Sequence, residues 1–464
     1  MENQNKARAD LRQLMPFFIV AFVGIIYHLR IRPMAGDDVF FSQATSELGL
    51  WDYLIQRYET WTSRFVIEFL LVWIIKYPIL WRLIDLTLFI SFPVLISKIF
   101  DGGKLMDWCA AAAVLLYPFH DMGTAGWITT TVNYFWPVWG MFFVGFLLKK
   151  MLVHKKINIV EGIAGVLVCV IASSHEHVAV ILFVVFILYG IYLICGKSKK
   201  TPLVQDSAGS TLTDKKVIHS NNLYLAGMVL VNIITLISIL LCPGNAGRNA
   251  VSIADLPIFE TYGFGDKLYL GLLSIERVFI ANCDAVFLTV ALVLAMLVYV
   301  KTDDYKKTII SALPVLILFG QTAMRTAYPG LSGLFVMPQE ITEWSWGTLS
   351  TWLPMVYLAV TVAAMLYALW IILGEQPIEY IYALLMLGCG FGAGMILGFM
   401  ATIYVSGERV YITLYFILLF VTMFCIYRMA DAVEEKLKQT GGKLAVTLLA
   451  LICLINIGFV TLSC

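Results

Sequence analysis

The chain has 464 residues, of which 60% are hydrophobic and 14% are charged, and its mean hydropathy is +0.85. Soluble domains are typically about 45–50% apolar and about 25% charged, so this composition excludes an ordinary soluble domain and predicts an all-α polytopic membrane protein. A net charge of +1 argues against nucleic-acid binding, and nine scattered cysteines without a CxxC spacing indicate neither a zinc site nor a disulfide framework.

Apolar runs along the chain predict about thirteen transmembrane helices in a single domain covering 1–464. Lys6, Arg8 and Arg12 precede the first run, so the positive-inside rule places the N-terminus in the cytoplasm. The run at 64–77 has only 14 residues. It is interpreted as a juxtamembrane or partly inserted helix, with fourteen spans as the alternative. The predicted spans are 14–32, 79–100, 105–120, 133–150, 157–172, 177–196, 222–241, 282–300, 308–323, 350–373, 379–403, 409–428 and 443–461.

Polar stretches between these runs predict loops on both sides of the membrane. The first outer loop, 33–78, is expected to hold juxtamembrane helices that lie at the interface. The segment 197–220 is rich in Ser, Thr and Lys, and it predicts a flexible cytoplasmic loop. Segments 242–281 and 324–349 are predicted outer loops, and the first is expected to include an amphipathic interfacial helix. This arrangement leaves the basic loops on the cytoplasmic side.

Two adjacent carboxylates, Asp37 and Asp38, lie where the first span is expected to meet water. Carboxylates at that depth are costly to desolvate, so they commonly bind a ligand or accept a proton. The plainer interpretation is a solvated pair that caps a helix or forms a turn. The pair is nevertheless a candidate catalytic base, because other unusual polar clusters fall on the same predicted side.

Two further outer segments place polar side chains between apolar runs. The segment 120–134 ends in Asn133 and Tyr134, which suit sugar hydroxyls but also fit an interfacial aromatic belt. The turn Ser-Ser-His-Glu-His places His175 and Glu176 at membrane depth, where ionisable groups are expensive. Adjacent residues on one turn point in different directions, which disfavours a metal site. A hydrogen-bonding catalytic or binding role and a solvated turn both stay open.

Arginines at the outer ends of later spans are candidate phosphate ligands. A Pro-Gly pair stops the helix before Asn245 and Arg248, and the guanidinium fork of arginine suits phosphate oxygens. The alternative for Arg248 is a side chain that snorkels to the interface. Arg409 lies at a predicted helix N-terminus, where a cation gains nothing from the helix dipole, so a bound anion would explain it. Arg325 begins a loop of acids and indoles that fits a carbohydrate surface and a membrane interface equally.

Short motifs follow one another along the chain: Gly-Asp-Asp-Val-Phe-Phe at 36–41 with Trp-Thr-Ser-Arg-Phe at 61–65, Trp…Thr…Asn-Tyr-x-Trp at 127–136, Pro-Gly-Asn-x-x-Arg at 243–248, and the late Arg409. In this arrangement the chain resembles the GT-C superfamily of integral-membrane glycosyltransferases, and within it a bacterial branch. In that superfamily an acidic residue or pair ends the first span and interfacial helices follow. The motif Trp-Thr-Ser-Arg-Phe at 61–65 adds Arg64 to the candidate substrate-binding residues.

The resemblance implies an enzyme that transfers a sugar from a polyprenyl-phosphate donor to a cell-envelope glycan or glycolipid, outside the cell membrane. It implies Asp37 or Asp38 as general base. Members differ in their use of a divalent metal such as Mg²⁺ or Mn²⁺ at the acidic site. This sequence has an adjacent pair where an Asp-x-Asp triplet would indicate a metal, so metal dependence stays open.

We expect an inverting transfer in which Arg248 and Arg409 stabilise the departing lipid phosphate. Glu176 and His175 would orient the acceptor or the sugar. The alternative from another class is a transporter or flippase of a lipid-linked or anionic solute. That function calls for ionisable residues near the middle of the membrane, and the sequence offers acids mainly near the ends of predicted spans.

Overall fold

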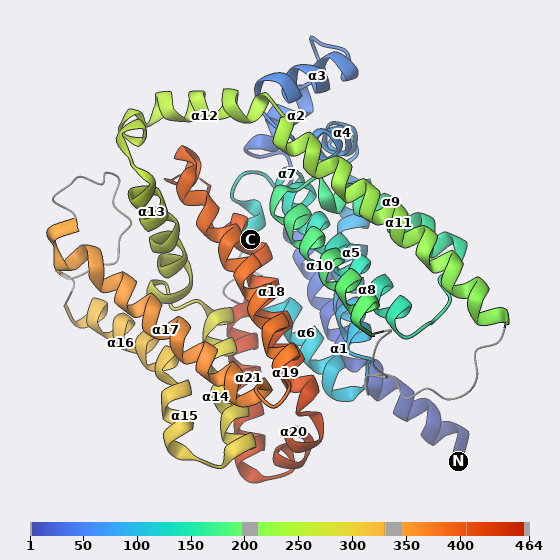
Figure 1. Cartoon of the computed structure of the whole chain (residues 1–464), viewed down its shortest axis with the longest axis vertical. Coiled ribbons are helices and arrows are strands. Elements are labelled where there is room, and N and C mark those ends of the chain that lie inside the picture. The colour runs from blue at the N-terminus through green and yellow to red at the C-terminus, as the bar shows by residue number, and fades with distance from the viewer. Residues whose placement is uncertain (1, 197–211, 329, 331–345, 405, 459–464) are drawn as a thin grey trace. The chain divides into compact units, whose positions relative to one another are not determined.

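The computed structural model describes residues 2–196, 212–328, 330, 346–404 and 406–458. These residues form α-helices, 3-10 helices and two short π-helices, and no strand occurs among them (Figure 1). Within this described part, nine helices are long and apolar enough to cross a membrane, or eleven if two bent pairs each count as one span. The all-α, polytopic membrane class is therefore supported.

The chain divides into two compact units, and both contain membrane-length helices. Unit 1 comprises Met1–Arg30, Gly103–Asp121 and Asn249–Cys464, and unit 2 comprises Ile31–Gly102 and Met122–Arg248. The helices of unit 2 are α2 (Asp37–Gln43), α3 (Leu50–Thr60), α4 (Phe65–Ile74), α5 (Pro78–Ile99), α7 (Trp127–Thr130), η2 (Thr131–Phe135), α8 (Trp136–Leu152), α9 (Ile159–Ser173), α10 (Glu176–Gly196) and α11 (Leu212–Leu241).

Unit 1 contains most of the C-terminal half of the chain. Its helices are α1 (Glu2–Arg30), α6 (Lys104–Leu116), η3 (Pro257–Thr261), α13 (Phe264–Glu276), η4 (Arg277–Ala281), α14 (Ala285–Thr302), α15 (Tyr305–Ser311), α16 (Leu313–Ala327), α17 (Leu349–Leu373), α18 (Pro377–Met395), η7 (Ile396–Phe399), η8 (Ala401–Tyr404), η9 (Glu408–Tyr411), α19 (Ile412–Arg428), α20 (Ala430–Leu437) and α21 (Thr440–Asn456). Two elements, η1 (Phe119–Gly123) and α12 (Gly244–Asp255), run from one unit into the other.

In unit 2, α9 packs against α8 and α11, and α10 also packs against α11. These helices run side by side in Figure 1, drawn in teal to light green. Only 11% of the span in α11 is buried, although it is strongly apolar. An exposed apolar helix of this length faces lipid. One side of unit 2 is therefore a lipid-facing surface.

The predicted first outer loop contains three short helices, α2, α3 and α4. Helix α4 has 10 residues, so it rises about 15 Å, roughly half of the ~30 Å hydrocarbon core of a bilayer. This length agrees with a partly inserted helix.

In unit 1, α19 is the central helix, because 83% of its span is buried. Helices α14 and α18 pack against it, and Arg428 Nε lies 2.7 Å from Glu379 Oε2 between α18 and α19. The amphipathic helix predicted in this region, at about 266–280, is present as α13. Helix α13 is buried along most of its length and packs against η7 and α18, where Gly271 permits close backbone contact with Met395.

The thirteen predicted spans remain a prediction. Nine long helices and two bent pairs give eleven, so thirteen requires that α6 and α9 also cross. These helices have 13 and 15 residues, which corresponds to about 20 and 22 Å. Most of the predicted loops 197–220 and 324–349 lies outside the described residues.

Candidate functional site

The carboxylate of Asp38 is held by four hydrogen bonds in unit 2. Its oxygens accept from the backbone N–H of Met34, Ile128 and Thr129 at 3.1, 3.3 and 2.8 Å, and from Thr129 Oγ1 at 2.8 Å. Asp38 is completely buried. It therefore caps the N-terminus of α7 from a different segment of the chain.

Gly126 makes this capping possible. Its φ of +111° favours glycine, and a Cβ at this position would lie 2.7 Å from Asp38 Oδ1. Asp37 differs from its neighbour, because its side chain is exposed while its backbone N–H donates to Ala125 O at 2.8 Å. Of the predicted carboxylate pair, Asp38 is completely buried and Asp37 is an exposed residue.

The π-helix η2 positions Asn133 and Tyr134 directly after α7. Asn133 Nδ2 donates to Thr129 O at 2.8 Å, which fixes the amide so that Oδ1 accepts from Arg64 Nη1 at 3.2 Å. The Arg64 guanidinium lies over the Tyr134 ring, 5.4 Å from its centroid. Single π-helical turns inside α-helices are frequent at functional sites.

Arg64 forms the most extensive side-chain contact of the cluster, with Glu176. Arg64 Nη2 lies 2.7 Å from Glu176 Oε2, and Arg64 Nε donates to both carboxylate oxygens at 2.9 and 3.1 Å. Ser63 Oγ also donates to Glu176 Oε1 at 3.1 Å. Burial alone would lower the pKa of Arg64, but the adjacent Glu176 raises it, so the pair is fully ionised.

His175 adds an imidazole whose hydrogen-bonding capacity is unused. It is 1% exposed, and neither ring nitrogen has a hydrogen-bond partner among the described residues. Its ring lies 5.2 Å from that of Tyr134 and 5.3 Å from that of His177. Burial, with Arg64 and His177, lowers its pKa well below the usual value. A neutral imidazole offers one donor and one acceptor, and buried polar groups normally have partners.

The turn between α11 and α12 brings Arg248 to the same cluster. Gly244 and Gly247 at the start of α12 pack directly on the backbone of residues 58–62, which a Cβ would not permit. Arg248 interacts electrostatically with Glu176, Arg64 and Tyr134. Burial lowers the pKa of Arg248, and the attraction of Glu176 offsets part of that effect. Arg64 and Arg248 thus both interact with the carboxylate of Glu176.

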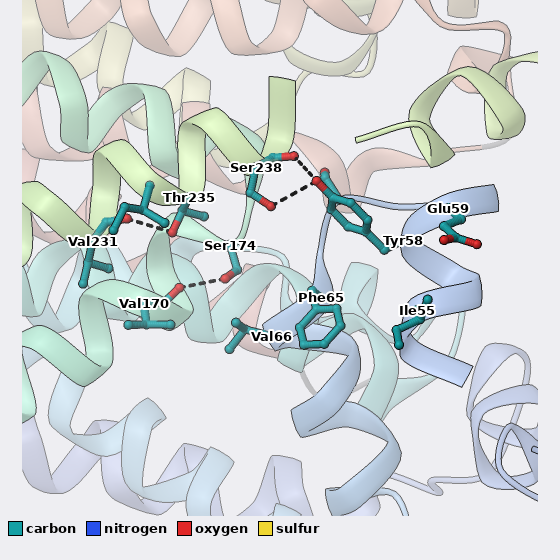
Figure 2. Close-up of a pocket in the computed structure, with 12 residues that line it drawn as sticks. Ile55, Tyr58, Glu59, Phe65, Val66, Val170, Ser174, Val231, Thr235 and Ser238 are labelled. Carbon is teal, nitrogen blue, oxygen red and sulfur yellow. Dashed lines mark hydrogen bonds between the residues drawn. The ribbon is translucent and has the colours of Figure 1, made fainter. Parts of the chain in front are cut away.

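An open groove of about 490 Å³ borders this cluster. Ser63 and Ser174, the residues immediately before Arg64 and His175, both line it. Figure 2 shows side chains of α3 and α4 on one side of it and those of α9 and α11 on the other. Its lining is mainly apolar with several hydroxyls, and it comprises Ile55, Tyr58, Glu59, Ser63, Phe65, Val66, Val170, Ser174, Val231, Ile234, Thr235 and Ser238.

The other predicted binding residues have different surroundings. Asn245 Nδ2 donates to the carbonyl of Ile239 at 3.0 Å, in the last turn of α11. Arg325 and Arg409 belong to unit 1. Arg325 donates to the Ala281 carbonyl, and Arg409 interacts electrostatically with Asp121. Arg409 therefore has an acidic partner within its own unit.

Sequence reasoning missed several participants in unit 2. Ser63 and Thr129 supply hydroxyls to the carboxylates of Glu176 and Asp38. His177 was noted only as part of a turn. Ser63 and Thr129 lie in hydroxyl-rich stretches near Arg64 and Asn133, which is the only signal of their role in the sequence. Their hydrogen-bond partners, Glu176 and Asp38, are distant in the sequence.

A divalent metal at the acidic pair does not fit these side chains. Both oxygens of Asp38 are already engaged, so the pair does not present two carboxylates to one cation. No group of three His, Cys, Asp or Glu side chains with metal-binding geometry occurs in the described part of the chain.

Comparison with known proteins finds no matching family model, no matching curated protein and no matching solved structure.

Proposed function

We propose that the chain is a membrane glycosyltransferase that uses a polyprenyl-phosphate-linked sugar, with the lipid phosphate bound by Arg64 and Arg248. The observation that carries this proposal is the mainly apolar groove that borders the half-buried cluster of unit 2, where Arg64 and Arg248 both interact with Glu176. A polyprenyl phosphate has the same two parts, a long apolar chain and an anionic head.

Electrostatics support a phosphate at this cluster. Arg64 and Arg248 both approach Glu176, so a single carboxylate faces two cations. Arginine binds phosphate through parallel hydrogen bonds, and those bonds are strengthened in a partly buried site. The unused N–H of neutral His175 supplies a further donor. Arg248 and Arg64 thus replace the pair Arg248 and Arg409 expected from sequence.

The position of the groove supports a lipid ligand. Val231, Ile234 and Thr235 of α11 contribute to its lining, and α11 is the most exposed apolar helix of unit 2. A chain lying in the lipid can therefore enter beside α11. The volume lies within the range of ligand pockets, about 300–1,000 Å³.

The chemistry assigned to this site is an inverting transfer. The acceptor O–H gives its proton to Asp37 while its oxygen attacks the anomeric carbon, and the bond from that carbon to the phosphate oxygen breaks. The polyprenyl phosphate departs with the additional charge, which Arg64 and Arg248 stabilise. Asp37 is the preferred base because the carboxylate of Asp38 is occupied by structural hydrogen bonds.

Sugar release from synthetic polyprenyl-phosphate hexoses tests this assignment in the full chain reconstituted in nanodiscs. We expect Asp37→Asn to slow release or transfer by roughly 10²–10⁴-fold, the usual contribution of a general base. The matched control is Asp52→Asn, which changes an exposed acid in the same predicted loop. Equal rates for Asp37→Asn and the unmodified chain would remove the base assignment.

The alternative is a transporter or flippase of a lipid-linked or anionic solute. One observation favours it: unit 1 holds the buried acids Asp121 and Glu276. Vesicles separate the two functions. Cleavage of the sugar from its lipid supports the enzyme, whereas movement of the intact lipid-linked sugar across the vesicle membrane supports the transporter.

A further inference from the structure

Unit 1 contains three acids that the proposed sugar transfer does not use. Asp121 lies in η1, Asp284 precedes α14 and Glu408 begins η9. Asp121 is 3% exposed, and the negative charges of Glu408 and Asp284 both act on it. Segments far apart in the sequence thus bring a buried carboxyl group, that of Asp121, close to the half-buried carboxyl groups of Asp284 and Glu408.

Two tyrosine hydroxyls face these acids. Tyr415 donates to Asp284 Oδ2 at 3.1 Å. Tyr117 packs edge-on against Tyr415, with ring centroids 5.4 Å apart, and it interacts electrostatically with all three acids. Tyr117 is fully buried, yet its hydroxyl has no hydrogen-bond partner among the described residues. A buried hydroxyl without a partner is unusual, and this one lies within electrostatic reach of three potential acceptors.

Two arginines lie near the acids in the part of the chain that the structure describes. Arg409 attracts Asp121 and Arg277 attracts Glu408. Burial lowers the pKa of His120, whose Nε2 lies 3.1 Å from Asp121 Oδ1, so this imidazole is neutral near pH 7. Polar groups that also face the acids include Asn282, which donates to Glu408 at 3.1 Å, and Tyr411 in η9.

We propose that the acid–tyrosine cluster, formed by Asp121, Asp284, Glu408, Tyr117 and Tyr415, is a proton-binding site that holds one proton among its three carboxyl groups. Carboxylates that share a buried site cannot all ionise easily, and a proton removes the excess negative charge. The three acids lack metal-binding geometry, and an anion would be repelled. This site goes beyond the proposed sugar transfer and does not depend on it.

The direction of the pKa shifts agrees with this geometry. Burial raises the pKa of Asp121 to about 8, and Glu408 and Asp284 add to the effect while Arg409 opposes it. Burial also raises the pKa of Asp284 to about 7, although hydrogen bonds from Phe287 and Tyr415 oppose the rise. The cluster consequently exchanges its proton near neutral pH, as acids in proton-coupled membrane proteins do.

Infrared difference spectroscopy of the full chain in lipid nanodiscs, with carbon-13 in its aspartates, tests the site directly. We expect a carbonyl band of protonated aspartate at neutral pH that disappears with a midpoint between about 7 and about 8. Asp121→Asn removes the part of the band that titrates at the higher pH. A band that titrates below about pH 5, as ordinary aspartates do, would overturn the proposal.

A second variant retains every acid, so it keeps the test decisive if Asp121→Asn does not fold. Tyr415→Phe removes a hydrogen bond that stabilises the charged form of Asp284, so the midpoint moves to higher pH. Tyr27→Phe is the matched control, because it removes an equally buried hydroxyl that donates to Phe119 O in unit 1. Identical midpoints in these two variants would contradict the proposal.

Discussion

At the scale of single residues, adjacent acids have divided roles. Asp38 accepts four hydrogen bonds in a fully buried position, while Asp37 beside it is exposed. The division follows from the helical start of α2, where successive side chains point in different directions. The same local sequence thus supplies a structural anchor for α7 and an exposed acid beside it.

This division predicts different effects of two substitutions. Asp38→Ala leaves buried N–H groups of Ile128 and Thr129 without acceptors, each at a cost of about 1–3 kcal/mol. We expect a clear fall in the thermal unfolding temperature in nanodiscs, whereas Asp37→Ala leaves that temperature nearly unchanged. Equal thermal stability of both variants would show that the hydrogen bonds of Asp38 do not anchor α7.

Sequence reasoning found most side chains of the unit 2 cluster but few of their partners. Arg64, Asn133, His175, Glu176 and Arg248 were singled out because polar groups in an apolar chain are expensive. Their pairing was not predictable, because Arg64 and Glu176 are joined only by the packing of segments 112 residues apart. For the same reason the sequence pairs Arg248 with Arg409 and does not predict that Arg409 interacts with Asp121 in unit 1.

At the scale of elements, the break between α11 and α12 determines where Arg248 lies. The sequence predicted a helix end at Pro243 and Gly244, and this is confirmed by α11 ending at Leu241 and α12 beginning at Gly244. Gly244 also packs closely on the backbone of Tyr58 and Trp61. The sequence does not predict this contact. A stop signal is local, whereas a close approach depends on a segment elsewhere in the chain.

Gly244→Ala tests whether that close approach positions Arg248. The added methyl group would overlap the backbone of Trp61 and Thr62, so α12 must move and carry Arg248 away from Glu176. We expect weaker binding of polyprenyl phosphate although every charged side chain is retained. Gly190→Ala is the control, because a Cβ there has nothing within 4 Å. Unchanged binding in Gly244→Ala would contradict this role.

At the scale of the whole molecule, the open question is how many helices cross the membrane. The prediction of thirteen spans places residue 155 on the opposite side from residues 47 and 246, provided that α6 and α9 both cross. Both helices are shorter than the bilayer core is thick, but much of α6 is buried in protein. Protein-covered segments can cross with fewer residues than lipid-exposed ones.

Membrane-impermeant maleimide labelling resolves this count. Single cysteines replace the exposed residues Glu47, Lys155 and Ala246 in a chain whose native cysteines have been removed. We expect label from outside at positions 47 and 246 and from inside at position 155. Labelling of positions 47 and 155 from one side would show that α6 does not cross. Labelling of positions 155 and 246 from one side would show that α9 does not cross.

The most direct test of the central claim is equilibrium binding of polyprenyl phosphate to the full chain in nanodiscs, measured beside polyprenol, which lacks the phosphate. Loss of a charge-assisted hydrogen bond, worth about 1.5–3 kcal/mol, predicts that Arg248→Gln weakens polyprenyl-phosphate binding roughly 10- to 100-fold. Polyprenol binding should not change. Arg82→Gln, which alters a half-buried arginine bonded to a backbone carbonyl of unit 2, should leave both unchanged. If Arg248→Gln binds polyprenyl phosphate as tightly as the unmodified chain does, the cluster is not the phosphate site.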